Sequence, residues 1–148
     1  MAAAVLIAAL FMEYVLHIRP CELCHLQRLP YLGLLAVCFI AIFSSNLRKQ
    51  MLIVMLILLA TSILLAFTHI GVEQGWPGFA MSCVNNFDLS GSFAEFKQSI
   101  NQQAIVPCDQ AQFHFLGFSL PYWNLLISCV LLRTTILQIY NYDKETDR

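Results

Sequence analysis

The residues best suited to chemistry are two cysteines, Cys21 and Cys24, separated by two residues in the stretch Pro20-Cys-Glu-Leu-Cys24. On a helix these positions lie on one turn, so their sulfurs can meet in a disulfide or face a third reactant together. Pro20 suits the first turn of a helix, which places both thiols near a helix N-terminus. There the peptide dipoles, with Arg28 one turn after Cys24, favour a thiolate. A thiolate attacks disulfides, binds metals and donates electrons.

The composition places this pair in a membrane protein. The chain has 148 residues, of which 59% are hydrophobic and 11% charged, outside the range of ordinary soluble domains. The length allows one integral-membrane domain, residues 1–148. A net charge of −1 provides no basic face for a phosphate backbone, so no nucleic-acid partner is expected.

Four apolar runs predict the elements that position the thiols. They cover about residues 1–18, 25–43, 51–70 and 120–140, and the first would extend about 27 Å as a helix. A cleaved signal peptide is the alternative for the first run, but no basic segment opens it and no small-x-small site precedes Cys21. The predicted fold is therefore an all-α bundle of four transmembrane helices, with loops at about 19–28 and 71–119. Within the first run, Glu13 precedes His17 by four residues, so the two are expected to share a face and a hydrogen bond.

Four spans place both termini on one side of the membrane and both cysteine-bearing loops on the other side. Cys21, Cys24, Cys83 and Cys108 then share one compartment. The positive-inside rule assigns Arg48, Lys49, Lys144 and Arg148 to the cytoplasm. The four loop cysteines accordingly face an oxidising space such as the bacterial periplasm. Cys38 and Cys129 lie inside spans, where cysteines usually pack as small hydrophobic residues.

The long second loop contains a predicted surface helix. Ser92 and Glu95 have capping-box spacing, and four apolar residues fall on one helical face, namely Leu89, Phe93, Phe96 and Ile100. Such a helix would lie on the membrane surface between Cys83 and Cys108.

The residues by themselves leave several interpretations of the cysteines open. Cys21 and Cys24 could form a redox pair, half of a zinc site completed by Cys83 and Cys108, or simply structural thiols. With His25 they also match the Cys-x-x-Cys-His signature of c-type haem attachment, which would need a large cavity and a second axial ligand such as His69. Cys83 and Cys108 alone would most often be a structural disulfide, stabilising the fold by about 3–4 kcal/mol. Beside a second exposed pair, thiol–disulfide exchange becomes the favoured interpretation.

Several motifs together resemble one family. Arg19-Pro-Cys-Glu-Leu-Cys24 with Arg28 is similar to the first-loop motif of the disulfide-bond-formation protein B (DsbB) family of bacterial inner membranes. Further similar features follow in the same order, namely Thr68-His69, Pro77-Gly-Phe-Ala-Met-Ser-Cys83, and Cys108 followed by Phe115-Leu-Gly-Phe-Ser-Leu-Pro121-Tyr-Trp123. The likeness covers nearly the whole chain, and Gln27 stands where members of that family carry an acidic residue.

The resemblance implies an activity, a cofactor, a partner and a role for each site residue. Such a protein oxidises a periplasmic thioredoxin-fold thiol oxidase of the DsbA type and passes the electrons to a membrane quinone, ubiquinone or menaquinone. Cys83 would form the mixed disulfide with the partner, and Cys108 would be its companion in a Cys83–Cys108 disulfide. Cys21 would exchange with that pair, and Cys24 would donate to quinone from a Cys21–Cys24 disulfide. Arg28 and His69 would flank the quinone ring. The alternative is a haem- or zinc-binding membrane protein with a permanent Cys83–Cys108 disulfide.

Overall fold

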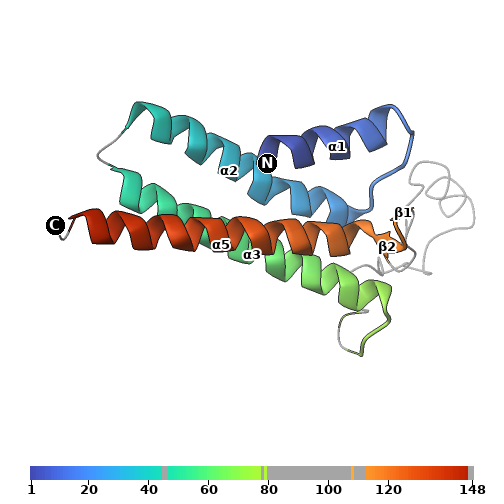
Figure 1. Cartoon of the computed structure of the whole chain (residues 1–148). Helices are drawn as coiled ribbons and strands as arrows, with labels where there is room; N and C mark the ends of the chain where they lie inside the picture. The colour runs from blue at the N-terminus through green and yellow to red at the C-terminus, as the bar shows by residue number, and fades with distance from the viewer. Residues whose placement is uncertain (45–46, 78, 80–107, 109–112, 147–148) are drawn as a thin grey trace, which may run out of the picture.

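The structure is a computed structural model that describes residues 1–44, 47–77, 79, 108 and 113–146. The described residues form the helices α1 (Ala2–Tyr14), α2 (Glu22–Phe43), α3 (Arg48–Glu73) and α5 (Leu120–Thr146) and the strands β1 (His114–Phe115) and β2 (Phe118–Ser119). Figure 1 shows α2, α3 and α5 as a long bundle, with the shorter α1 lying along α2.

Three of these helices, α2, α3 and α5, are long and apolar enough to cross a membrane. The helix α1 is apolar as well but has only 13 residues, which extend about 20 Å. That is less than the roughly 30 Å of a hydrocarbon core. The first helix is thus shorter than the predicted run 1–18, because the helix ends at Tyr14 and His17 adopts a left-handed backbone conformation with φ 56°.

The other helices contain the predicted apolar runs and extend beyond them. The helix α2 begins at Glu22, three residues before the predicted span, and α3 adds a turn or less at each end. The helix α5 continues past residue 140 into the charged tail. Cys21 is the N-cap of α2, so Pro20 lies outside the helix rather than in its first turn.

The helices pack through α3, which lies against both α2 and α5, while α1 lies against α2. The core of this packing is formed by Leu6 of α1, Tyr31 and Leu34 of α2, and Leu59 of α3. Gly33 brings α2 close to α3, since a Cβ at this position would lie 3.0 Å from Leu58 Cδ1. Small residues at helix crossings serve the same purpose in membrane proteins generally.

The two cysteines inside the helices do not pack in the core. Cys38 of α2 and Cys129 of α5 are both exposed on the outer surface of the bundle. The expectation that they pack inside is therefore wrong, because their positions on the helices direct the thiols outward. Many large apolar side chains are exposed beside them, including Phe39, Ile40 and Val130.

The chain enters α5 through a tight hairpin. Strands β1 and β2 are antiparallel and pair His114 with Ser119 and Phe115 with Phe118. Leu116 and Gly117, the two residues of the turn, both have positive φ, as a type I′ hairpin turn requires. Ser119 Oγ donates a hydrogen bond to Glu73 Oε2 at 2.6 Å, which fixes the hairpin to the end of α3.

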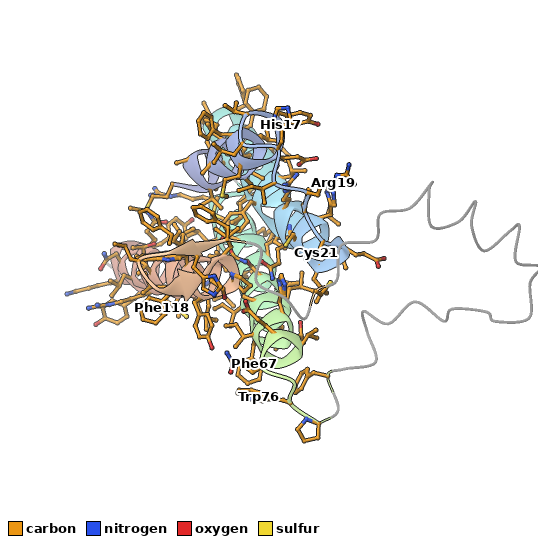
Figure 2. All side chains as sticks on the ribbon, turned by 90° about the vertical axis from the view of Figure 1, so that its right-hand side faces the viewer. His17, Arg19, Cys21, Phe67, Trp76 and Phe118 are labelled. Carbon is orange, nitrogen blue, oxygen red and sulfur yellow. The ribbon has the colours of Figure 1, made fainter. Side chains whose placement is uncertain are left out.

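The segment after α1, the end of α3 and the start of α5 gather at one end of the bundle, which we call the thiol end (Figure 1). Viewed toward this end, Figure 2 shows Cys21 among the helix ends, with His17, Phe118 and Trp76 around it. The end of α2, the start of α3 and the end of α5 lie at the opposite end (Figure 1). The predicted surface helix at 89–100 and Cys83 fall outside the described residues.

Candidate functional site

Cys21 and Cys24 meet at the start of α2 in the way their spacing predicts. Cys21 has extended backbone angles, φ −74° and ψ 170°, and its Sγ accepts the backbone N–H of Cys24 at 3.4 Å. The two sulfurs lie 2.8 Å apart as thiols. A disulfide needs about 2.05 Å between the sulfurs, so oxidation of this pair requires only a small movement.

His69 reaches the pair from α3. Its Nε2 lies 3.6 Å from Cys21 Sγ, and its side chain is buried. On the other side of the ring, Gln27 Nε2 lies 3.0 Å from His69 Nδ1. The same amide nitrogen of Gln27 donates to the Leu65 carbonyl at 3.3 Å. A buried residue of α2 therefore bridges the imidazole to the backbone of α3.

The hydrogen bonds continue from Gln27 into the bundle. Gln27 Oε1 accepts Asn124 Nδ2–H at 2.8 Å, and Asn124 Oδ1 accepts the hydroxyl of Tyr31. The Tyr31 hydroxyl also bonds Ser128 Oγ at 2.9 Å, and Ser128 bonds Ser62 at 2.9 Å. Within the described part of the chain, no buried side-chain nitrogen or oxygen lacks a partner. A complete polar network thus links the thiol pair to the middle of three helices, where partial satisfaction would be costly.

Beside the thiol pair lies an apolar cavity of about 240 Å³. It is lined by one side of α1, by the segment from Ile18 to Cys21, and by parts of α2, α3 and α5. The polar and ionisable lining residues are Glu13, Arg19, Cys21, Cys24, Gln27, Arg28, Tyr31, His69, Glu73, Ser119, Trp123 and Asn124. Arg28 Nη1 forms an ion pair with Glu13 Oε2 in this lining.

The pairing of Glu13 corrects the sequence expectation. Glu13 was expected to bond His17, but α1 ends between them, and His17 Nδ1 instead lies 3.2 Å from the Val15 carbonyl oxygen. Glu13 points toward α2 and pairs with Arg28. The carboxylate within the first apolar run is therefore compensated by the cation predicted to act beside Cys24.

A third cysteine reaches the same place. Cys108 is buried in one hydrophobic cluster with Cys21, Leu23 and Val72, and Cys24 packs against this cluster. Both Cys21 and Cys108 are only 5% exposed. The second loop thus returns a thiol to the first-loop pair, as thiol exchange between loops requires.

The neighbouring thiol and burial determine how tightly Cys21 holds its proton. The hydrogen bond with Cys24, followed by burial, raises the pKa of Cys21 to about 12. His69 opposes this change but does not outweigh it. Cys21 therefore holds its proton more tightly than an ordinary cysteine thiol does.

The structure gathers most of the residues selected from sequence. Cys21, Cys24, Arg28 and His69 line one cavity, and Cys108 lies against the thiol pair. Gln27 was noticed only as a departure from the resembled family, and nothing in the sequence pointed to Asn124. Both are polar residues within apolar helices, and that signal could have identified them.

The metal-binding and haem-binding interpretations can both be compared with this geometry. The ligand atoms of Cys21, Cys24 and His69 all lie within 4.8 Å of one another, so this trio could hold a metal ion. However, a metal-bound histidine usually donates its second ring N–H to an acceptor, whereas here Gln27 presents an amide N–H to His69 Nδ1. For haem, His25 of the signature is exposed and is not among the cavity-lining residues.

The comparison with known proteins agrees with the motifs. Residues 1–138 match the family model described as "Disulfide bond formation protein DsbB". The uncharacterized protein RP370 of Rickettsia prowazekii is 32% identical, over 86% of this chain and 76% of the relative.

Two relatives named disulfide bond formation protein B are also similar. That of Pseudoalteromonas translucida is 28% identical over 90% of this chain and 80% of its own length. That of Stutzerimonas stutzeri is 26% identical over 85% of this chain and 81% of its own length. The thiol pair, the polar network and the cavity therefore stand in a chain that belongs to the DsbB family.

Proposed function

We propose that this chain is a protein-dithiol:quinone oxidoreductase of the bacterial inner membrane that reoxidises a DsbA-type thiol oxidase of the periplasm. Membership of the DsbB family, which implies disulfide bond formation, supports the first half of this activity. The single observation that carries the second half is the position of the Cys21–Cys24 pair in the wall of an apolar cavity that also contains Arg28 and His69.

The cavity suits a quinone ring in size and chemistry. An engineered apolar cavity of about 150 Å³ binds benzene, so about 240 Å³ leaves room for one substituted ring. Arg19 and Arg28 are donors in the lining that could bind its carbonyl oxygens, and His69 lies beside the thiols in the same wall. Apolar residues of α1 and α5 line the rest, including Val5, Met12 and Ile127. A quinone bound there supplies an acceptor for two electrons and two protons.

The protein's own thiols complete the proposed path by exchange. The partner's dithiol loses two electrons and two protons as its disulfide forms, and the Cys83–Cys108 disulfide gains them as two thiols. These thiols in turn become a disulfide by reducing the Cys21–Cys24 bond. The packing of Cys108 against Cys21 supports this second exchange, because the attacking and attacked sulfurs must come into contact.

The charge distribution supports the proposed orientation. Lys49 Nζ forms an ion pair with Asp143 at 2.8 Å, and the guanidinium of Arg48 lies over the Tyr142 ring at 5.7 Å. Under the positive-inside rule, these cations support a cytoplasmic position for the end opposite the thiols. Aromatic residues gather near the thiol end, including the pair Phe67 and Trp76 at 5.5 Å, as at a membrane interface.

The test is whether the purified protein catalyses quinone-dependent oxidation of a reduced thioredoxin-fold dithiol. We expect turnover that requires Cys21, Cys24, Cys83 and Cys108. Cys108→Ala should accumulate a mixed disulfide with the partner through Cys83, whereas Cys83→Ala should accumulate none through this loop.

The competing interpretation has its own signature. One zinc per chain, or a haem absorption band that survives denaturation, together with no quinone reduction, would replace this proposal with a metal- or haem-binding protein. Equal trapping by Cys83→Ala and Cys108→Ala would remove the assignment of Cys83 as the partner-facing sulfur.

A further inference from the structure

The orientation of the Gln27 side chain is determined by a neighbour that can only accept. Gln27 Nε2 lies 3.3 Å from the Leu65 carbonyl oxygen, which has no hydrogen to donate. The amide therefore presents its NH₂ group to Leu65 and its oxygen to Asn124, whose Nδ2–H donates to it at 2.8 Å. Reversing the amide would bring two carbonyl oxygens together at Leu65 and two NH₂ groups together at Asn124.

This orientation determines the protonation of His69. The second hydrogen of Gln27 Nε2 points to His69 Nδ1 at 3.0 Å, so Nδ1 must be the acceptor. A neutral imidazole has one N–H and one acceptor nitrogen. The proton is then on Nε2, which faces Cys21 Sγ at 3.6 Å.

We propose that Gln27 is a positioning residue that holds His69 as the neutral Nε2–H tautomer, so that His69 donates a hydrogen bond to the sulfur of Cys21. The hydrogen bonds then run in one direction, from the Gln27 amide to His69 and from His69 to Cys21. The sulfur of Cys24 lies 2.8 Å from that of Cys21, and either thiol could donate in this contact.

This direction places two hydrogen-bond donors at the sulfur of Cys21. That sulfur accepts from His69 Nε2–H and from the backbone N–H of Cys24. Donors to a sulfur favour its thiolate form, so Gln27 acts on the Cys21 thiol through His69. The part of this inference that concerns turnover rests on the proposed function, because Cys21 and Cys24 both line the cavity.

The same tautomer separates a redox site from a metal site. Coordination by His69 Nε2 needs a lone pair on that nitrogen and a hydrogen on Nδ1. Gln27 opposes both while its amide remains bonded to Leu65 and Asn124. The position of one proton on His69 therefore distinguishes the two chemistries that Cys21, Cys24 and His69 could support.

The test is nitrogen NMR of the reduced protein labelled with ¹⁵N-histidine. The other three histidines, His17, His25 and His114, are all exposed. A His17→Asn, His25→Gln, His114→Gln background leaves His69 as the single imidazole, and asparagine tolerates the positive φ at position 17. At neutral pH we expect a protonated Nε2 and an unprotonated Nδ1. A proton on Nδ1, or on both nitrogens, would overturn the proposal.

Two substitutions of Gln27 give matched comparisons. Glu at position 27 can still accept from Asn124 but offers His69 Nδ1 an acceptor, so Gln27→Glu should place hydrogens on both ring nitrogens. Gln27→Met keeps the length of the side chain and removes the donor, so it should give a mixture of tautomers. An unchanged pattern of ring protonation in both variants would show that Gln27 does not set the tautomer.

A second readout follows the sulfurs rather than the ring. With limiting iodoacetamide, the wild-type pair should be alkylated at Cys24 before Cys21. In Gln27→Glu the charged imidazole should favour a thiolate at Cys21, and the ratio of Cys24 to Cys21 labelling should fall by about tenfold. An unchanged ratio alongside altered ring protonation would overturn the hydrogen bond from His69 to the sulfur of Cys21. Neither readout involves quinone or partner, so loss of the proposed function would leave both interpretable.

Discussion

At the scale of single residues, the thiol of Cys21 has a strongly raised pKa. Its hydrogen bond with Cys24, and then its burial, raise its pKa from about 9 to about 12. The folded reduced protein therefore holds this proton where the unfolded chain has lost it. The stabilisation is complete below pH 9 or so and is lost as the pH rises toward about 12.

We expect the raised pKa of Cys21 to appear in an ultraviolet thiolate titration of the reduced protein. The Cys21 transition should have its midpoint near pH 12. Cys24→Ala should lower this midpoint, because the substitution removes the hydrogen bond that contributes most to the raised pKa. Cys38→Ala is the control, since it removes an exposed thiol far from the pair. A Cys21 midpoint that does not change in Cys24→Ala would contradict the hydrogen bond between the sulfurs.

The ion pair between Arg28 and Glu13 changes how a substitution of Arg28 must be interpreted. The two side chains are 17% and 22% exposed, so removing one leaves a partly buried charge without its partner. Loss of stability and loss of quinone binding would then be confounded in Arg28→Met alone.

A double substitution separates the two effects. Arg28→Met with Glu13→Gln should recover most of the thermal stability lost in Arg28→Met. The KM for quinone should remain raised by about tenfold, which corresponds to the binding free energy lost with one charge-assisted hydrogen bond. Arg28→Lys should fall between Met and wild type, because lysine keeps the charge but lacks the planar fork. Wild-type quinone kinetics in the double variant would restrict Arg28 to an interfacial or structural role.

At the scale of the helices, the cavity lies where α1 packs along α2, while α3 lies against both α2 and α5. The cavity is lined by residues of α1, α2, α3 and α5. The distance between α2 and α3 also positions the site, because Gln27 and His69 must bond across it. Gly33 permits this distance.

We expect a large side chain at Gly33 to separate the helices. Gly33→Leu should destabilise the protein by about 1–3 kcal/mol, the usual cost of overpacking, and should weaken the bond between Gln27 and His69. Gly33→Ala should be close to neutral, because its Cβ would meet only the end of the flexible Leu58 side chain. Ala36→Leu, on the exposed side of the same helix, is the matched control. Thermal unfolding in detergent measures all three variants, and equal losses in Gly33→Leu and Ala36→Leu would contradict this packing.

At the scale of the whole molecule, the exposed apolar surface implies contact with lipid. Cys38 and Cys129 are exposed on the protein but lie within helices long and apolar enough to span a membrane. In native membranes we expect neither to react with a membrane-impermeant maleimide, whereas both should react in detergent with a small apolar reagent.

Reporter cysteines at exposed positions extend this test to topology. Gln74→Cys at the thiol end should be labelled from outside the cell, and Asn141→Cys at the opposite end only after permeabilisation. Labelling of Cys38 or Cys129 in intact membranes would show that these helices face water. Labelling of Gln74→Cys only after permeabilisation would reverse the proposed orientation.

The sequence by itself determined the class of protein and the chemistry of its thiols. Apolar runs identify helices because a buried or lipid-facing helix must be apolar along most of its length. The spacing of Cys21 and Cys24 identifies a pair because it corresponds to one helical turn. The motifs around these cysteines were enough to identify the family, which the family comparison confirmed.

Only the tertiary structure decided what surrounds the pair. No local pattern relates Gln27 to His69 or Asn124, which are 42 and 97 residues away, because such contacts depend on how helices cross. The partner of Glu13 was predicted wrongly for the same reason: the local candidate, His17, lies beyond the end of α1, and packing against α2 supplied Arg28 instead. The direction of the hydrogen bond from His69 to Cys21 likewise depends on the Leu65 carbonyl of α3. Every residue has a backbone carbonyl, so no pattern of side chains in the sequence indicates this contact.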